Sequence, residues 1–126
     1  MVNLGGATEN DRKKIVITKD SKAFFHNNVD YCVGTGRMGL ALTEEYQEEL
    51  RLVQKEIGFK HIRGHGLFCD DMAIFQIYEE DGKVRVEYNY TYLDRVMDAY
   101  KKVGLRPFLE LGFMPKKLAS GSQTIF

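Results

Sequence analysis

The residues best suited to metal or acid–base chemistry cluster in one mid-chain stretch. They are His61, His65, Cys69, Asp70 and Asp71. On a helix the first three would share a face and resemble a zinc site. Gly64 and Gly66 argue against a helix, and on a strand a four-residue step spans about 13 Å, which one ion cannot bridge. We therefore expect a strand and no metal site here.

Two features of this stretch bear on ligand binding. His65 stands between glycines, which indicates a place where a ligand comes close to the backbone. A lone histidine in this setting could equally be a hydrogen-bonded core group. Asp70 and Asp71 are adjacent, so their carboxylates point in different directions and cannot easily flank one bond. Capping of a loop is the favoured role for both.

A glycine-rich run earlier in the chain matches a nucleotide-binding motif. Residues 34–39 fit the pattern G-x-G-x-x-G, which brings a backbone close to a pyrophosphate at the start of a helix. The expected helix begins near Thr43, four residues past the third glycine, and the strand around Ile62 does not end in the acidic residue that binds a ribose hydroxyl. A glycine-rich loop after a short strand at 31–33 is the favoured interpretation.

Composition excludes several classes of partner. The 126 residues carry 18 basic and 18 acidic side chains, and this zero net charge disfavours nucleic acids and anionic membranes. No apolar run approaches the roughly 20 residues of a membrane span. Cys32 and Cys69 are too few for a disulfide framework, so we expect reduced thiols in a cytoplasmic protein. Residues 1–28 are predicted to be a polar tail without a signal-peptide pattern, with a candidate edge strand at 15–17.

Two helices must position these side chains. The first is predicted to be capped by Thr43 and to end at Gly58. The second is predicted to begin at Thr91, with Asp94 as its capping-box partner, and to end at Gly104. Apolar residues recur at helical spacing in both. They are Tyr46, Leu50, Val53 and Ile57 in the first helix, and Leu93, Val96, Met97, Tyr100 and Val103 in the second.

The same helix-to-strand unit occurs twice in the chain. The terminating glycines, Gly58 and Gly104, lie 46 residues apart, and a short apolar strand follows each, around Ile62 and over 108–111. This repetition predicts an α/β fold with parallel strands. Between the units, Asp81-Gly82 flanked by alternating residues predicts a β-hairpin in the loop after the second strand. Such folds bind ligands at the carboxyl ends of their strands.

Three segments of the chain carry a family resemblance. They are Cys-Val-Gly-Thr-Gly-Arg-Met-Gly-Leu-Ala-Leu at 32–42, Ile-Arg-Gly-His-Gly-Leu at 62–67, and Gly-Phe-Met-Pro-Lys-Lys-Leu-Ala-Ser-Gly at 112–121. In this order they resemble the opening segment, the second barrel strand and the loop after the third strand of bacterial β-xylosidases of glycoside hydrolase family 39. The resemblance implies that residues 29–126 form about three βα units, the N-terminal part of a (β/α)8 TIM barrel, with the hairpin inserted after the second strand.

The resemblance also implies a retaining mechanism, in which two glutamates flank the glycosidic bond about 5 Å apart. In the family the acid/base glutamate follows an asparagine, and no Asn-Glu pair occurs in this chain. We therefore expect the N-terminal portion of an enzyme that hydrolyses terminal β-xylosides of xylo-oligosaccharides, without the catalytic glutamates and inactive alone. A stand-alone sugar-binding or interaction module derived from the barrel is the alternative. The sugar could be a relative of xylose, since the family includes iduronidases.

The resemblance assigns substrate binding to particular residues. His65 matches the family's sugar-contacting histidine, and Phe126 resembles an aromatic wall of the sugar pocket. Phe113 could be a second wall or a core residue, and Arg63 could orient a carboxylate or form a structural ion pair. The implied partner is xylose or a xylo-oligosaccharide, with no cofactor and no metal. Because barrel closure removes strand edges, we also expect self-association through the edge at 108–111.

Overall fold

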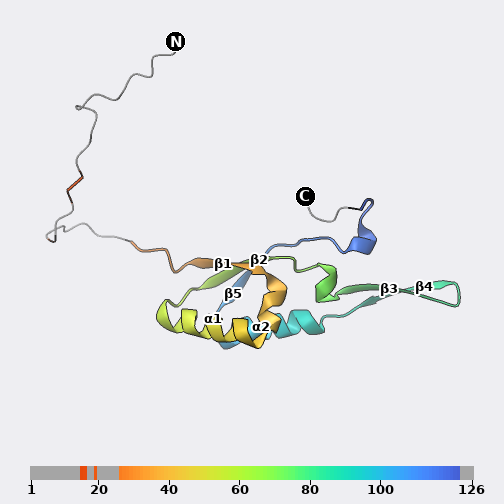
Figure 1. The fold of residues 1–126 in the computed structure, drawn as a ribbon, viewed down its shortest axis with the longest axis horizontal. Helices are drawn as coiled ribbons and strands as arrows, with labels where there is room; N and C mark the ends of the chain where they lie inside the picture. Colours follow the sequence, from red (N-terminus) through yellow and green to blue (C-terminus); the bar gives the residue numbers. More distant parts are fainter. Residues whose placement is uncertain (1–14, 17–18, 20–25, 123–126) are drawn as a thin grey trace, which may run out of the picture.

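The computed structural model describes residues 15–16, 19 and 26–122 (Figure 1). Its strands are β1 (Cys32–Arg37), β2 (His61–His65), β3 (Phe75–Glu80), β4 (Lys83–Tyr88) and β5 (Arg106–Leu109), and its α-helices are α1 (Glu44–Glu56) and α2 (Thr91–Lys102). Three 3-10 turns lie in the connections: η2 (Met38–Leu42), η3 (Asp70–Met72) and η4 (Lys116–Leu118). The candidate edge strand at 15–17 extends outside the described residues and stays a prediction.

Three parallel strands form the sheet that carries the fold. Their order is β1-β2-β5, with Ile62 opposite Val33 on one side and Pro107 on the other. Both α-helices lie on the same side of this sheet (Figure 1). The predicted α/β arrangement with parallel strands is therefore confirmed. Neither helix of the described residues is long and apolar enough to cross a membrane.

The core lies between the sheet and the helices. Its largest fully buried side chains are Tyr100, Met38, Ile62, Met72 and Val96. Tyr100 donates its hydroxyl hydrogen to Sδ of Met38 at 3.7 Å, and burial raises the pKa of this phenol. From the predicted helix stripes, Leu50, Val96 and Tyr100 belong to this core, and Tyr46, Leu93, Met97 and Val103 pack against it. Ile57, which follows α1, is 55% exposed.

β1 and β2 approach each other closely at Gly64. A Cβ atom there would lie 2.7 Å from both Sδ of Met38 and Cγ2 of Thr35, and 3.2 Å from the carbonyl oxygen of Gly36. The prediction of a loop after residue 33 was wrong, because β1 continues to Arg37. The strand can continue because Gly64 leaves room for it on the neighbouring strand.

Both α-helices begin where predicted, but their capping hydrogen bonds differ from the prediction. Thr43 occupies the N-cap position of α1, but its hydroxyl donates to the carbonyl oxygen of Leu40 at 2.8 Å. At α2 the backbone N–H of Thr91 donates to Oδ1 of Asn89 at 2.9 Å. Asn89 thus takes the capping role that was predicted for Thr91 and Asp94, because its side chain reaches the first free N–H of the helix.

The two helix exits are alike, and one side chain connects them. Gly58 and Gly104 have φ values of +75° and +77°, in the left-handed region that glycine favours. Nε2 of Gln54 in α1 donates to the carbonyl oxygen of Phe59 at 2.9 Å and to that of Val103 at 3.1 Å. The predicted glycine stops are confirmed, and Gln54 joins the two exits.

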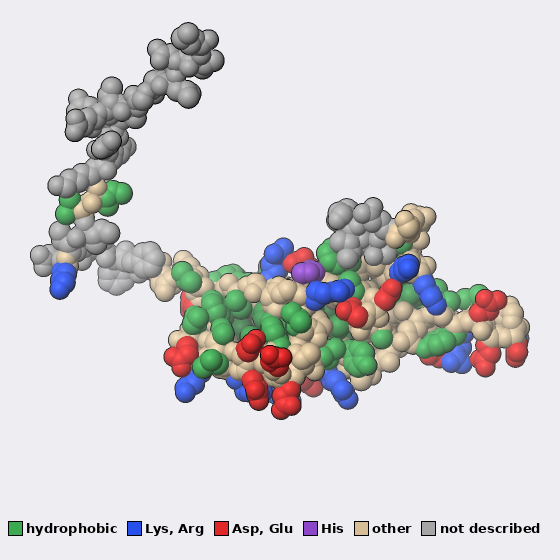
Figure 2. Space-filling view, viewed as in Figure 1, with side chains coloured by type: hydrophobic (Ala, Val, Ile, Leu, Met, Phe, Trp, Pro, Cys, Tyr) green, Lys and Arg blue, Asp and Glu red, His purple; other side chains and the backbone are tan. Residues whose placement is uncertain are grey.

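β3 and β4 form the antiparallel hairpin expected around Asp81-Gly82, with their six residue pairs in register. Asp81 and Gly82 have φ values of 53° and 68°, as a type I′ turn requires. The hairpin projects away from the rest of the molecule, and its tip carries the acidic side chains of Glu79, Glu80 and Asp81 (Figures 1 and 2).

Substitution of Gly64 tests the close contact between β1 and β2. We expect Gly64→Ala to destabilise the chain by roughly 1 to 3 kcal/mol, because the added methyl group overpacks the contact with Met38 and Thr35. Gly34→Ala is the matched control, since a Cβ there meets nothing within 4 Å. Thermal melting followed by circular dichroism measures both variants. Equal melting temperatures for the two variants would contradict the packing argument.

Alkaline unfolding tests the buried phenol. The pKa of Tyr100 is raised in the folded state above its ordinary value of 10.0, so the folded state holds this proton more tightly. The resulting stability is fully present below about pH 10 and is lost as the pH rises toward the folded-state pKa. We expect the urea midpoint of the wild type to fall as the pH rises above about 10, and Tyr100→Phe to reduce that fall. Tyr92→Phe, an exposed tyrosine of the same helix, should leave it unchanged.

Candidate functional site

The carboxyl ends of the three parallel strands meet at one edge of the sheet. His65 is the last residue of β2, and its register partner Arg37 is the last residue of β1. β5 ends at Leu109, two residues before the predicted end of the strand, and the loop at 110–118 begins from the same edge. His65 therefore lies where α/β folds bind their ligands.

His65 contacts an aromatic ring from the loop after β5. The ring centroids of His65 and Phe113 lie 5.6 Å apart in a T-shaped arrangement with an interplanar angle of 66°. The backbone N–H of Phe68 donates to the carbonyl oxygen of Gly112 at 3.3 Å, which holds this loop beside the one that follows β2. The structure thus brings together two residues that the sequence analysis selected. Both are half-buried, so each keeps part of its surface accessible.

Arg63 lies on the same face of β2 as His65, directed away from the helices. Its neighbours Ile62 and Gly64 are buried, and alternate residues of a strand point to opposite faces. Nη2 of Arg63 lies 3.0 Å from Oε1 of Glu110, with side chains that are 59% and 33% exposed. An exposed pair adds about 0–1 kcal/mol of stability, so its main effect is to orient the two groups.

Arg37 is a cation at this edge that the sequence analysis did not select. Its Nη2 lies 3.6 Å from Oδ2 of Asp71. The pKa of its guanidinium is raised, first by a hydrogen bond with Cys69 and then by the charge of Asp71. The sequence analysis did not select Arg37 because the glycine motif around it suggested a loop. A strand ending in a basic residue was the signal that could have identified it.

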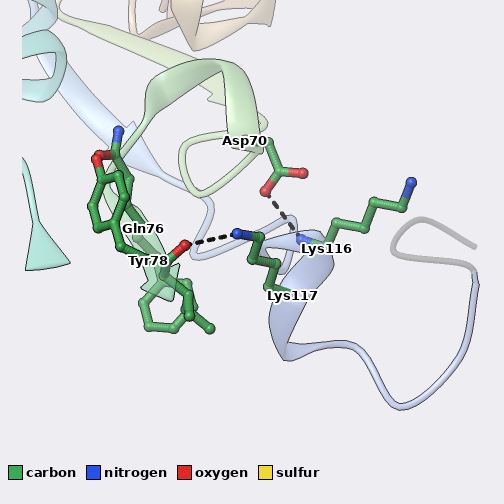
Figure 3. A pocket seen from close by; sticks show the side chains of 7 residues that line it. Asp70, Gln76, Tyr78, Lys116 and Lys117 are labelled. Carbon is green, nitrogen blue, oxygen red and sulfur yellow. Dashed lines mark hydrogen bonds between the residues drawn. The ribbon is translucent and has the colours of Figure 1, made fainter. Parts of the chain in front are cut away.

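The adjacent carboxylates of Asp70 and Asp71 serve separate contacts. Oδ1 of Asp70 accepts from the backbone N–H of Lys116 at 3.1 Å, at the first residue of η4 (Figure 3). Asp71 pairs with Arg37. The two carboxylates therefore do not act on one bond, and Asp70 caps the start of a turn.

A cavity of about 390 Å³ lies between the hairpin and the loop after β5 (Figure 3). Its lining residues are Asp70, Phe75, Gln76, Ile77, Tyr78, Lys116 and Lys117. Nζ of Lys117 donates to the carbonyl oxygen of Ile77 at 2.8 Å. Neither His65 nor Phe113 lines this cavity, so these two sequence-selected residues lie at the strand ends and not in it.

The remaining sequence predictions have different outcomes. Phe126 lies outside the described residues, so its role stays a prediction. Within the described part of the chain, no three His, Cys, Asp or Glu side chains are grouped to hold a metal ion. Gly34 and Gly36 lie inside β1 rather than at a helix start, so the geometry of a dinucleotide motif is missing. Cys32 and Cys69 are free thiols.

Comparisons with known proteins agree on one family. The model for Glycosyl hydrolases family 39 matches residues 13–126. A β-xylosidase of Geobacillus stearothermophilus is 51% identical over 114 residues, which are 90% of this chain and 23% of that protein. A β-xylosidase of Caldicellulosiruptor saccharolyticus is 37% identical over 95 residues, 75% of this chain and 19% of that protein. A solved structure, described as a monomeric β-xylosidase from Caulobacter crescentus, has a TM-score of 0.68 at 35% identity and covers 77% of this chain and 19% of its own.

The similarity covers most of this chain but a small part of its relatives. The chain spans 23% and 19% of the two curated β-xylosidases named above. The family model nevertheless matches far more than half of the chain, and it includes all three strands of the parallel sheet. The chain belongs to glycosyl hydrolase family 39.

Proposed function

We propose that this chain is the N-terminal portion of a retaining β-xylosidase that hydrolyses terminal β-xylosides of xylo-oligosaccharides. It contributes the first three strands of a (β/α)8 barrel and the helices α1 and α2 that follow the first two strands, with the β3–β4 hairpin inserted after the second strand. The parallel order β1-β2-β5 supports this arrangement. Similarity to curated β-xylosidases, 51% identical in the case of Geobacillus stearothermophilus, supports the substrate class. The free thiols of Cys32 and Cys69 support a cytoplasmic location.

The observation that carries this proposal is the pairing of His65 with Phe113 at the strand ends. A pentose offers hydroxyl groups around its rim and C–H groups on its faces. A half-buried imidazole can hydrogen-bond a hydroxyl, and the adjacent ring offers an apolar wall to the sugar face. Sugar recognition by these two side chains is the role we assign to this segment.

Arg63 can assist without leaving its partner. A guanidinium has five N–H donors, and the contact with Glu110 uses one side of it. We propose that the pair holds both side chains on the open face of the sheet, where Arg63 can also donate to a sugar hydroxyl. The two roles predicted for Arg63, orienting a carboxylate and forming an ion pair, are then the same contact.

The carboxylates near this site have other roles. A retaining glycosidase needs two carboxyl groups about 5 Å apart, one as acid/base and one as nucleophile. Glu110 is held by Arg63, Asp70 by the backbone of Lys116, and Asp71 by Arg37. With no Asn-Glu pair in its sequence, this segment is proposed to bind the sugar while the catalytic glutamates come from later barrel strands.

The outer edge of β5 supports the proposed self-association. Phe108, Leu109 and Leu111 are 57%, 43% and 77% exposed at this edge of the sheet. An apolar parallel strand with unpaired backbone groups tends to acquire a neighbour. We propose that the 126-residue chain on its own associates through this edge, which a fourth barrel strand would otherwise cover.

The role of His65 can be measured in a completed enzyme. In a chimera, residues 29–122 of this chain replace the matching segment of the Geobacillus stearothermophilus β-xylosidase. We expect His65→Ala to lower kcat/KM for an aryl β-xyloside by roughly 30- to 1,000-fold, or about 2 to 4 kcal/mol, because a hydrogen bond that matters in the transition state is lost.

His61→Ala provides the matched control. His61 lies on the same strand face at its opposite end, in a tilted contact with Tyr31 whose ring centroids lie 4.8 Å apart. We expect this variant to change kcat/KM by less than about threefold, since it lies away from the site. An unchanged kcat/KM in His65→Ala, or equal losses in the two variants, would contradict the assignment.

The isolated chain is expected to bind without hydrolysis. Purified chain should not release the chromophore from an aryl β-xyloside above the rate of buffer, because it lacks the acid/base and nucleophile. Titration with xylose should still shift the imidazole resonances of wild-type chain relative to His65→Ala. Turnover by contaminant-free chain would refute the proposed division of roles. Absence of any xylose-dependent shift would refute the binding role.

A further inference from the structure

The projecting hairpin has one strand edge that the described residues leave open. Every residue of β4 is exposed apart from half-buried Glu87. The opposite edge of the hairpin is engaged, because Nζ of Lys117 donates to the carbonyl oxygen of Ile77 in β3. β4 contains no proline, and its pairing with β3 shows no bulge, so it lacks two of the features that usually protect an edge.

The backbone groups on this open edge can be identified. The N–H of Asn89 donates to the carbonyl oxygen of Ile74 at 2.9 Å, which continues the register of β3 and β4 by one pair. Hydrogen-bonding groups alternate in direction along an antiparallel strand. Counting back from Asn89, the N–H and C=O groups of Val84, Val86 and Tyr88 therefore point outward, away from β3.

The side chains of β4 divide between two faces. Val84, Val86 and Tyr88 are 70%, 45% and 63% exposed and share a face with the β3 residues opposite them, which are Glu79, Ile77 and Phe75. This face is largely apolar and stays exposed on β4, and an isolated two-stranded hairpin is only marginally stable.

The other face of β4 carries its charges. Nη2 of Arg85 lies 2.5 Å from Oε1 of Glu87, and the guanidinium lies 5.9 Å from the centre of the Tyr78 ring. Arg85 and Glu87 stand one residue on either side of Val86. The sequence Val84-Arg85-Val86-Glu87-Tyr88 is thus complementary to itself when it is reversed about its centre.

We propose that two copies of this chain pair through β4, antiparallel and around a twofold axis at Val86. Val84 then stands opposite Tyr88 of the second copy, and Arg85 stands opposite its Glu87. Each opposite-charge pair occurs twice, the outward backbone groups of both strands are satisfied, and the apolar stripes join across a four-stranded sheet. A two-residue shift of register, centred on Arg85, would place the two Arg85 side chains against each other and is disfavoured.

Charge reversal and mixing of variants test this pairing in the 126-residue chain. Arg85→Glu alone, or Glu87→Arg alone, converts both cross-strand pairs to like charges, and we expect dimerisation to weaken by about tenfold or more. An equimolar mixture of the two variants restores opposite charges at both pairs, because one copy is then acidic at positions 85 and 87 and the other is basic at both. Sedimentation velocity should therefore show dimers for the wild type and for the mixture, and fewer dimers for each variant alone.

Lys83→Glu is the matched control, since Lys83 faces Asn89 of the second copy in the proposed register and Glu87 in the shifted one. This variant should dimerise like the wild type, and a loss equal to that of Arg85→Glu would overturn the register. The association through the edge of β5 that is proposed above would contribute equally to every sample, so an extent of association that is the same in all samples would overturn pairing through β4. A wild-type chain that sediments as a monomer, as the Caulobacter crescentus relative is described, or a mixture no more dimeric than its components, would overturn it as well.

Discussion

The contact between Gly64 and Met38 determines where the site lies. Met38 is fully buried between β2 and α2, with the hydroxyl of Tyr100 on its sulfur and no Cβ on the strand side. That missing atom allows β1, its following turn and β2 to pack closely. His65 is the next residue along the strand, so its backbone position is fixed by the core. A side chain can present a hydrogen-bonding group in one direction only when its support is rigid.

The loop after β5 supports two regions at once. Phe113 stands against His65, while Lys116 and Lys117 bond to Asp70 and to the carbonyl oxygen of Ile77. One short segment therefore positions Phe113 beside His65 and also holds β3 of the hairpin. The loop needs these bonds because its own residues between β5 and η4 form no regular structure. Its shape is determined by its neighbours rather than by local propensity.

The local signals in the sequence were the reliable ones. Gly58 and Gly104 stop helices because few other residues adopt the left-handed conformation, and Asp81-Gly82 makes a hairpin turn for the same reason. The caps were less predictable, since several polar groups compete for the first turn of a helix. The hydroxyl of Thr43 donates to the carbonyl oxygen of Leu40. At α2, Oδ1 of Asn89 accepts from the backbone N–H of the first helical residue.

The site itself depended on information beyond local pattern. Glycine content suggested a loop where β1 continues, because the space that Gly64 provides belongs to a different strand. The contacts of His65 with Phe113 and of Arg63 with Glu110 join residues far apart in the chain, so no spacing rule could indicate them. The flanking glycines already indicated a ligand near His65, the family resemblance added Phe113 and Arg63, and the contacts came from the structure.

The side chain of Gln54 couples the stability of the two halves of the chain. A carboxamide has two N–H hydrogens, and here each serves the exit of a different helix. The bond to Val103 closes a loop of 49 residues, so it forms only after the second unit has docked on the first. Opening the end of either helix breaks part of the same small network. The repeated units are therefore not independent modules, and their exits should open to solvent as one cooperative segment.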